Sequence, residues 1–198
     1  GAKAASSPGD KPPGTSSAAD PQKVLDAMVE TYRNAKSYHD RGKLTFRGTV
    51  RTTKEALGPQ EYSVDFQRPN LARISVNEGS ILCDGKQFWA WTSGVSGQYV
   101  QREAPAQFSF AAWFDDPLVF QAIERGPAAG VSHYPVQLVL LAAKDPLKTL
   151  LYGLKEPAKL LSPEKIGDRT CDRVELVRDD GKVVLWIDAQ DRILRRID

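Results

Sequence analysis

Few side chains in this sequence have the types and the spacing that catalysis requires. The two histidines, His39 and His133, lie far apart, and no ligand pattern accompanies either of them, so a zinc site is not indicated. Ser162 and Lys165 have the Ser-x-x-Lys spacing of some serine acyl-enzymes, but the other motifs of that class are missing and chance explains the spacing better. There is no glycine-rich phosphate loop. The sequence therefore predicts a protein that is not an enzyme and uses no cofactor or metal.

Cysteine chemistry leaves two interpretations. Cys83 and Cys171 are the only cysteines. An even count permits one disulfide in an oxidising compartment. Two buried free thiols are the alternative, because free cysteine packs as a small apolar residue. Both interpretations stay open.

Aromatic side chains are the most prominent feature of residues 81–101. Phe88, Trp89 and Trp91 lie on one predicted strand. Because successive side chains of a strand point to opposite faces, Trp89 and Trp91 share one face and Phe88 lies on the other. Large apolar groups on both faces predict a sheet that is covered on both sides. A plain core is the alternative to a pocket, since each aromatic side chain buries ~150–250 Å² in any fold.

The composition is that of one globular domain. The chain has 198 residues, of which 41% are hydrophobic. Its net charge is only +2, so we expect no nucleic-acid partner. No apolar run reaches the ~18 residues of a membrane-spanning helix. Residues 1–19 are mostly Gly, Ala, Ser and Pro and predict a flexible linker, which leaves 20–198 as the folded domain.

Helices are expected in two places. Asp20 is a good N-cap and Pro21 suits the first turn of a helix that runs to about Ala35. Residues 104–153 are expected to form a helical cover: "DDPLVFQAIERG" and "KDPLKTLLYG" each begin with an Asp-Pro cap. Between them, "YPVQLVLLAA" is apolar all round, and its few β-branched residues favour a buried helix over a buried strand.

Period-two patterns predict antiparallel strands elsewhere. Apolar and polar residues alternate in 43–53 and 61–69, and strands continue to residue 103. Turns are expected at Pro69-Asn70, at Asp84-Gly85 and in "SGVSG". Strands return after residue 158, with four inward-facing residues: Val174, Leu176, Val183 and Leu185.

The stretch from 66 to 101 resembles the LolA-like periplasmic lipoprotein carriers of double-membraned bacteria. The shared features are an Arg-Pro-Asn-Leu turn, a strand that ends in Asp-Gly-Lys, and an aromatic strand; here they are Arg68, Pro69, Asn70, Leu71, Asp84, Gly85, Lys86, Phe88 and Trp89. Weaker similarity extends over residues 21 to about 190. The C-terminal strands are more similar to uncharacterised relatives of that superfamily than to the carriers.

The resemblance implies a fold and a function. The fold is α+β: an antiparallel, strongly curved sheet, an incomplete barrel, wrapped around a helical plug. The function is binding of an acyl chain, a lipid or a lipidated polypeptide in an apolar cavity between sheet and helices, in the periplasm or after export. The alternative is an interaction or sensor domain with a filled core, at the N-terminus of a larger envelope protein. Peripheral membrane contact and a further domain after residue 198 stay open, and a monomer is expected.

The expected site follows from the aromatic residues and the resemblance. Arg68 matches the arginine that links the sheet to the lid helices in that family; the alternative is a surface arginine beside a turn proline. The expected cavity lining consists of Phe46, Phe66, Phe88, Trp89, Trp91, Phe108, Phe110, Trp113, Phe114, Leu138 and Leu140.

Overall fold

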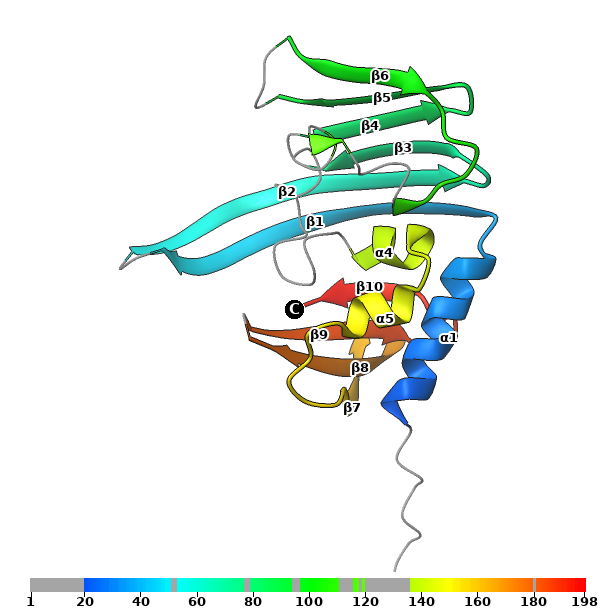
Figure 1. The fold of residues 1–198 in the computed structure, drawn as a ribbon. Helices are drawn as coiled ribbons and strands as arrows, with labels where there is room; N and C mark the ends of the chain where they lie inside the picture. Colours follow the sequence, from blue (N-terminus) through cyan, green and yellow to red (C-terminus); the bar gives the residue numbers. More distant parts are fainter. Residues whose placement is uncertain are drawn as a thin grey trace, which may run out of the picture.

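The computed structural model describes residues 20–50, 53–76, 79–93, 97–110, 116–117, 119, 136–179 and 181–198, and only the backbone of 44, 46–50, 53–58 and 76. These residues form two antiparallel sheets with helices between them (Figure 1). The six-stranded sheet precedes helices α4 and α5 in the chain, and the four-stranded sheet follows them. The expected linker, residues 1–19, lies outside the described residues.

The six-stranded sheet is a simple meander, with each strand paired to the next in sequence. Its strands are β1 (Ser37–Val50), β2 (Thr53–Gln67), β3 (Leu71–Val76), β4 (Gly79–Asp84), β5 (Gln87–Thr92) and β6 (Tyr99–Glu103). β1 and β2 are much longer than the others, and their far ends pair only with each other, so they project as a two-stranded ribbon (Figure 1). The predicted turns at Pro69-Asn70 and at Asp84-Gly85 are confirmed. Of the predicted "SGVSG" turn, the structure describes Ser93 and Gly97, and both are turn residues.

Helix α1 (Pro21–Asn34) begins where the sequence predicts. The Asp20 side chain accepts a hydrogen bond from the backbone N–H of Gln22 at 3.0 Å, which satisfies one of the free donors of the first turn. The apolar stripe of the helix is buried: Val24, Leu25, Met28, Val29 and Tyr32. Burial of this stripe, rather than intrinsic helix propensity, holds a helix of this length in place.

Two short helices confirm part of the predicted cover. α4 (Val136–Ala142) is buried at every position, as its all-round apolar sequence predicts. α5 (Pro146–Leu151) begins at Asp145, whose side chain accepts from the N–H of Lys148 at 3.0 Å. The helix expected in "DDPLVFQAIERG" lies almost wholly outside the described residues; within them, the Asp116 side chain accepts from the N–H of Val119 at 3.4 Å.

The four-stranded sheet has the order β10-β9-β8-β7. Its strands are β7 (Lys159–Ile166), β8 (Arg169–Arg178), β9 (Gly181–Asp188) and β10 (Leu194–Ile197). The four predicted inward residues, Val174, Leu176, Val183 and Leu185, are all buried. Together with α1, α4, α5 and the inner face of the six-stranded sheet they form one continuous hydrophobic core.

The structure establishes the antiparallel α+β class. All strand pairings of the described residues are antiparallel, and helices lie between the two sheets (Figure 1). Neither sheet closes on itself or curls strongly. The strands thus divide into a six-stranded and a four-stranded sheet, whereas the sequence predicts one continuous curved sheet.

Candidate functional site

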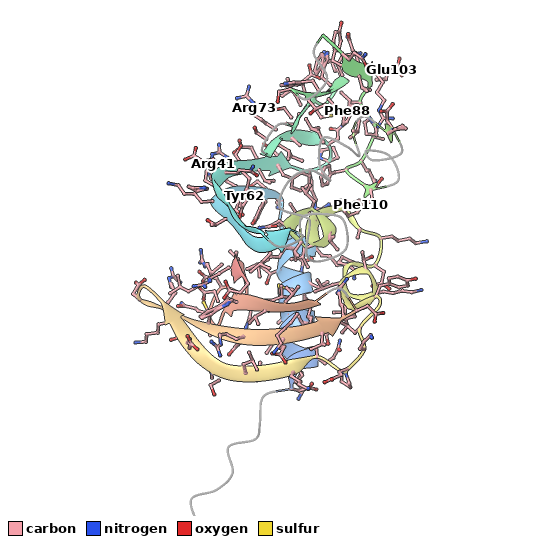
Figure 2. All side chains as sticks on the ribbon, turned by 90° about the vertical axis from the view of Figure 1, so that its left-hand side faces the viewer. Arg41, Tyr62, Arg73, Phe88, Glu103 and Phe110 are labelled. Carbon is pink, nitrogen blue, oxygen red and sulfur yellow. The ribbon has the colours of Figure 1, made fainter. Side chains whose placement is uncertain are left out.

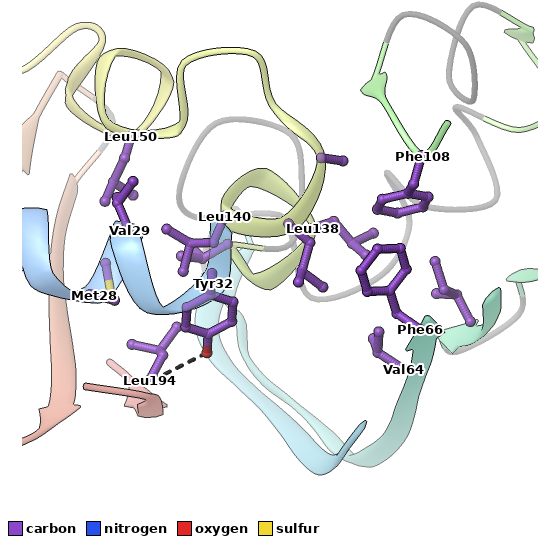
Figure 3. Close-up of a cluster of buried hydrophobic side chains, with 14 of the residues drawn as sticks. Met28, Val29, Tyr32, Val64, Phe66, Phe108, Leu138, Leu140, Leu150 and Leu194 are labelled. Atoms are coloured by element: carbon purple, nitrogen blue, oxygen red, sulfur yellow. Dashed lines mark hydrogen bonds between the residues drawn. The ribbon is translucent and has the colours of Figure 1, made fainter. Parts of the chain in front are cut away.

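Five of the predicted apolar residues belong to one buried cluster between the six-stranded sheet and α4: Phe66 of β2, Phe88 of β5, Phe108, and Leu138 and Leu140 of α4. The rings of Phe66 and Phe108 are in contact at a tilt of 44°, with their centroids 4.8 Å apart, beside Leu138 of α4 (Figure 3). Phe88, Leu138 and Leu140 are fully buried. Apolar side chains of helix α4 therefore pack against the inner face of the six-stranded sheet. We call the packed cluster of these five residues the apolar interior.

Trp89 and Trp91 do not join that interior. Phe88 faces the core, so the side chains on either side of it along β5 face outward. Trp89 is half-buried, and Trp91 is 41% exposed. The two tryptophans lie opposite Gln101 and Tyr99 of β6 on the outer face. The expectation that this sheet is covered on both sides is thus wrong at Trp91, because the exposed face of an antiparallel sheet tolerates large amphipathic aromatics.

The remaining predicted lining residues are placed only in part. Phe110 is half-buried and packs against the hydrophobic core. The side chain of Phe46, on β1, and all of Trp113 and Phe114 lie outside the described part of the structure.

Arg68 links the sheet to two helices. It lies at the end of β2, and its guanidinium donates to the carbonyls of Ala35 at 3.0 Å, Leu141 at 3.4 Å and Tyr32 at 3.5 Å. Tyr32 and Ala35 lie at the C-terminal end of α1, and Leu141 lies in the last turn of α4. One cation therefore satisfies carbonyls that the helix ends leave free. The guanidinium also lies 5.3 Å from the centre of the Phe66 ring. This arrangement ties the ends of both helices to the edge of the apolar interior.

A second polar cluster contacts the opposite end of α4. The Gln137 amide donates to the Tyr62 hydroxyl at 3.1 Å, and the Tyr62 hydroxyl donates to Asp40 at 3.1 Å. Tyr38 donates to the same Asp40 oxygen at 3.0 Å, and its hydroxyl lies 3.4 Å from that of Tyr32. We call Tyr32, Tyr38, Asp40, Tyr62 and Gln137 the tyrosine chain. Burial raises the pKa of Tyr32 to about 12 and also raises the pKa of Tyr38 and of Tyr62, so all three hydroxyls keep their protons.

Sequence reasoning missed the tyrosine chain. Tyr32 and Tyr62 fit the apolar patterns of their helix and strand. Their hydroxyl groups bind residues that are distant in the sequence, and such contacts produce no local pattern. The one available signal was Asp40, a carboxylate shortly before the strand predicted over residues 43–53.

The other chemical candidates are dispersed. His39 and Asp65 pair on the outer face with Nδ1 and Oδ1 2.5 Å apart, and Arg41 donates to the same carboxylate at 3.0 Å. His133 lies outside the described residues. Cys83 of β4 and Cys171 of β8 are buried free thiols in different sheets, and burial raises the pKa of both. Within the described ranges, no group of His, Cys, Asp and Glu is arranged to hold a metal ion.

A groove of about 450 Å³ lies between α1 and α5. Its lining is mostly charged or polar, and none of the predicted cavity residues belongs to it: the residues are Asp26, Val29, Glu30, Arg33, Asn34, Asp145 and Leu147. It does not have the apolar lining that an acyl chain requires.

Comparison of the sequence with known protein families and with curated proteins found no match. Among the residues that the structure describes, no helix is both long and apolar enough to cross a lipid bilayer.

Proposed function

We propose that this chain is a non-enzymatic envelope protein that binds an acyl chain, a lipid or a lipidated polypeptide in the apolar interior. In this proposal the two sheets are the walls of one incomplete barrel, and α4 is the lid that must move to admit the ligand. The sequence resemblance to the LolA-like carriers supports the ligand class. Export to the periplasm belongs to the same proposal.

The observation that carries the proposal is the position of Arg68. An arginine at a strand end that serves only as a surface residue would point into water. This one instead donates to carbonyls at the ends of α1 and α4, and its guanidinium lies beside the ring of Phe66, a member of the apolar interior. These hydrogen bonds can break when α4 moves, because they are few. They are also strong enough to favour the state in which α4 is closed.

A second candidate function is an interaction or sensor domain whose core stays filled. It is favoured by the tight packing of the interior, since Phe88, Leu138 and Leu140 have no exposed surface. A filled core needs no lid, and α4 would then be a static element.

Binding of an apolar fluorescent probe separates the two candidates. We expect the probe to bind and to be displaced by a long-chain fatty acid or a diacylated lipopeptide. Leu138→Ala, inside, should change probe affinity, whereas Trp91→Ala, on the outer face, should leave it unchanged. No binding to the folded protein would support the filled-core alternative, and sensitivity to Trp91→Ala alone would place the probe on the outer surface and contradict the proposal.

A further inference from the structure

The tyrosine chain links α4, the six-stranded sheet, α1 and β10 by hydrogen bonds. It begins at Gln137, in the first turn of α4, and passes through Tyr62 of β2 to Asp40 and Tyr38 of β1. It ends at Tyr32 of α1, whose hydroxyl accepts from the backbone N–H of Leu194 in β10 at 3.2 Å (Figure 3). One series of hydrogen bonds thus runs from α4, past the six-stranded sheet, to the edge strand of the four-stranded sheet.

The donor and the acceptor of each hydrogen bond follow from the number of hydroxyl protons available. Each tyrosine hydroxyl has a single proton. Tyr38 and Tyr62 both give theirs to the Asp40 carboxylate, so Tyr62 can only accept from Gln137. Since the proton of Tyr38 is used, Tyr32 must donate to Tyr38, and it accepts from Leu194 at the same time. Asp40 is therefore the common acceptor of two branches, one from α4 and one from β10.

Gly42 fixes the position of the Tyr62 ring. The two residues are paired across β1 and β2, and the ring lies over the glycine backbone. A Cβ atom at residue 42 would come within 2.2–2.5 Å of the ring edge and the hydroxyl, which the ring could not tolerate without moving. Only glycine at this position lets the Tyr62 hydroxyl reach both Asp40 and Gln137.

We propose that the tyrosine chain couples the opening of α4 to the docking of β10, so that the lid and this edge strand loosen together. The inference rests on the proposed function in treating α4 as the lid, and it identifies what regulates that lid. The described part of α4 has seven residues, which is too short to be stable alone, and Gln137 and Leu141 attach it to Tyr62 and to Arg68. Breaking the chain at Tyr38 removes one of the two hydroxyl donors of the half-buried Asp40 and leaves the buried Tyr32 hydroxyl without its acceptor, so each branch loses a partner at the point where the two branches meet.

Amide hydrogen exchange of the ligand-free protein tests the coupling. Tyr38→Phe removes the link between the two branches and touches neither Gln137 nor Leu194 directly. We expect exchange to rise about tenfold both in α4 and in β10, the factor that the loss of one hydrogen bond produces. Tyr99→Phe is the matched control, since Tyr99 is 64% exposed on the outer face, and it should change neither. Faster exchange confined to α1 and β1, with α4 and β10 unchanged, would overturn the proposal.

Gly42→Ala provides a second variant that keeps every hydroxyl. It displaces the Tyr62 ring, so α4 should exchange faster, and adding Tyr62→Phe should bring little further change because both act on the same contact. Additive effects would show that Tyr62 does not act through this geometry. These measurements contain no ligand, so the coupling is tested separately from binding; if Tyr38→Phe shows the coupling and no probe binds, only the proposed function fails.

Discussion

Arg68 holds the ends of α1 and α4, and its removal should act on the lid rather than on the fold. We expect Arg68→Leu to shorten the residence time of a bound acyl ligand, because bonds from a charged donor to carbonyls contribute ~1.5–3 kcal/mol to the closed state. Thermal stability should stay close to that of the parent protein. Stopped-flow release of a fluorescent acyl probe measures the effect.

Arg73→Leu is the control for that experiment. Arg73 lies on β3 and points away from the helices and from Phe110 (Figure 2), and within the described residues it has no ion pair. Its loss should leave release unchanged. An identical release rate in both variants would show that Arg68 does not control the lid.

Asp188 should make stability depend on pH. This carboxylate is 1% exposed, and burial alone would raise its pKa; hydrogen bonds from the backbone of Asp191 and Gln190, together with Arg195, outweigh burial and lower it. A lowered pKa stabilises the fold above the unfolded-state pKa of ~3.9, and this contribution is lost as the pH falls through the folded-state value.

Asp188→Asn should therefore destabilise the protein by ~1–3 kcal/mol at neutral pH, and the difference from the parent should shrink in acid. Urea unfolding at several pH values measures it, with the exposed turn residue Asp168 changed to Asn as control. If Asp188→Asn lowers the free energy of unfolding by the same amount down to the most acidic pH, the negative charge of Asp188 does not stabilise the fold as proposed.

Strand β5 has one buried and one exposed face, and substitutions on the two faces should change the free energy of unfolding by very different amounts. Phe88→Ala should cost ~3–5 kcal/mol, because it leaves a cavity in the packed interior. Trp91→Arg should cost only ~0.5 kcal/mol or less, because the side chain is largely exposed on the outer face. Chemical denaturation of both variants checks the assignment, and a large loss of stability in Trp91→Arg would mean that something covers this face.

Local signals in the sequence were enough to predict most helices and strands. Asp20 and Pro21 define the start of α1, and the Asp84-Gly85 turn defines the β4–β5 hairpin. These features depend on neighbours in sequence, and so does the alternation that buries Val174 and Leu176. Their physical causes are caps, turn preferences and the two-residue period, all of which can be read locally.

Features that depend on distant contacts could not be predicted in the same way. The division into two sheets is decided by where the helices pack, which no local pattern encodes. The outward direction of Trp91 depends on which face of β5 meets the core. The tyrosine chain needs Tyr32, Tyr62 and Gln137 to meet, and only the folded chain brings them together. The resemblance to the LolA-like carriers pointed to Arg68. The helix carbonyls to which it donates come close to it only in the folded chain.

The whole molecule should unfold as one unit, because one hydrophobic core joins both sheets. We expect the slowest-exchanging amides of β4 and of β8 to report the same free energy of opening. Native-state hydrogen exchange in low denaturant measures both. A four-stranded sheet that opens at a much lower free energy than the six-stranded sheet would show two separate cooperative units and would contradict the continuous core.

Calorimetric titration with saturated fatty acids of increasing chain length, each below its micelle concentration, tests most directly whether the apolar interior receives an acyl chain. Each added CH₂ that enters an apolar site contributes ~0.8 kcal/mol, so the dissociation constant should fall about fourfold per methylene until the interior is filled. Affinity that is absent, or that does not change with chain length while the protein remains folded, would contradict the proposed function.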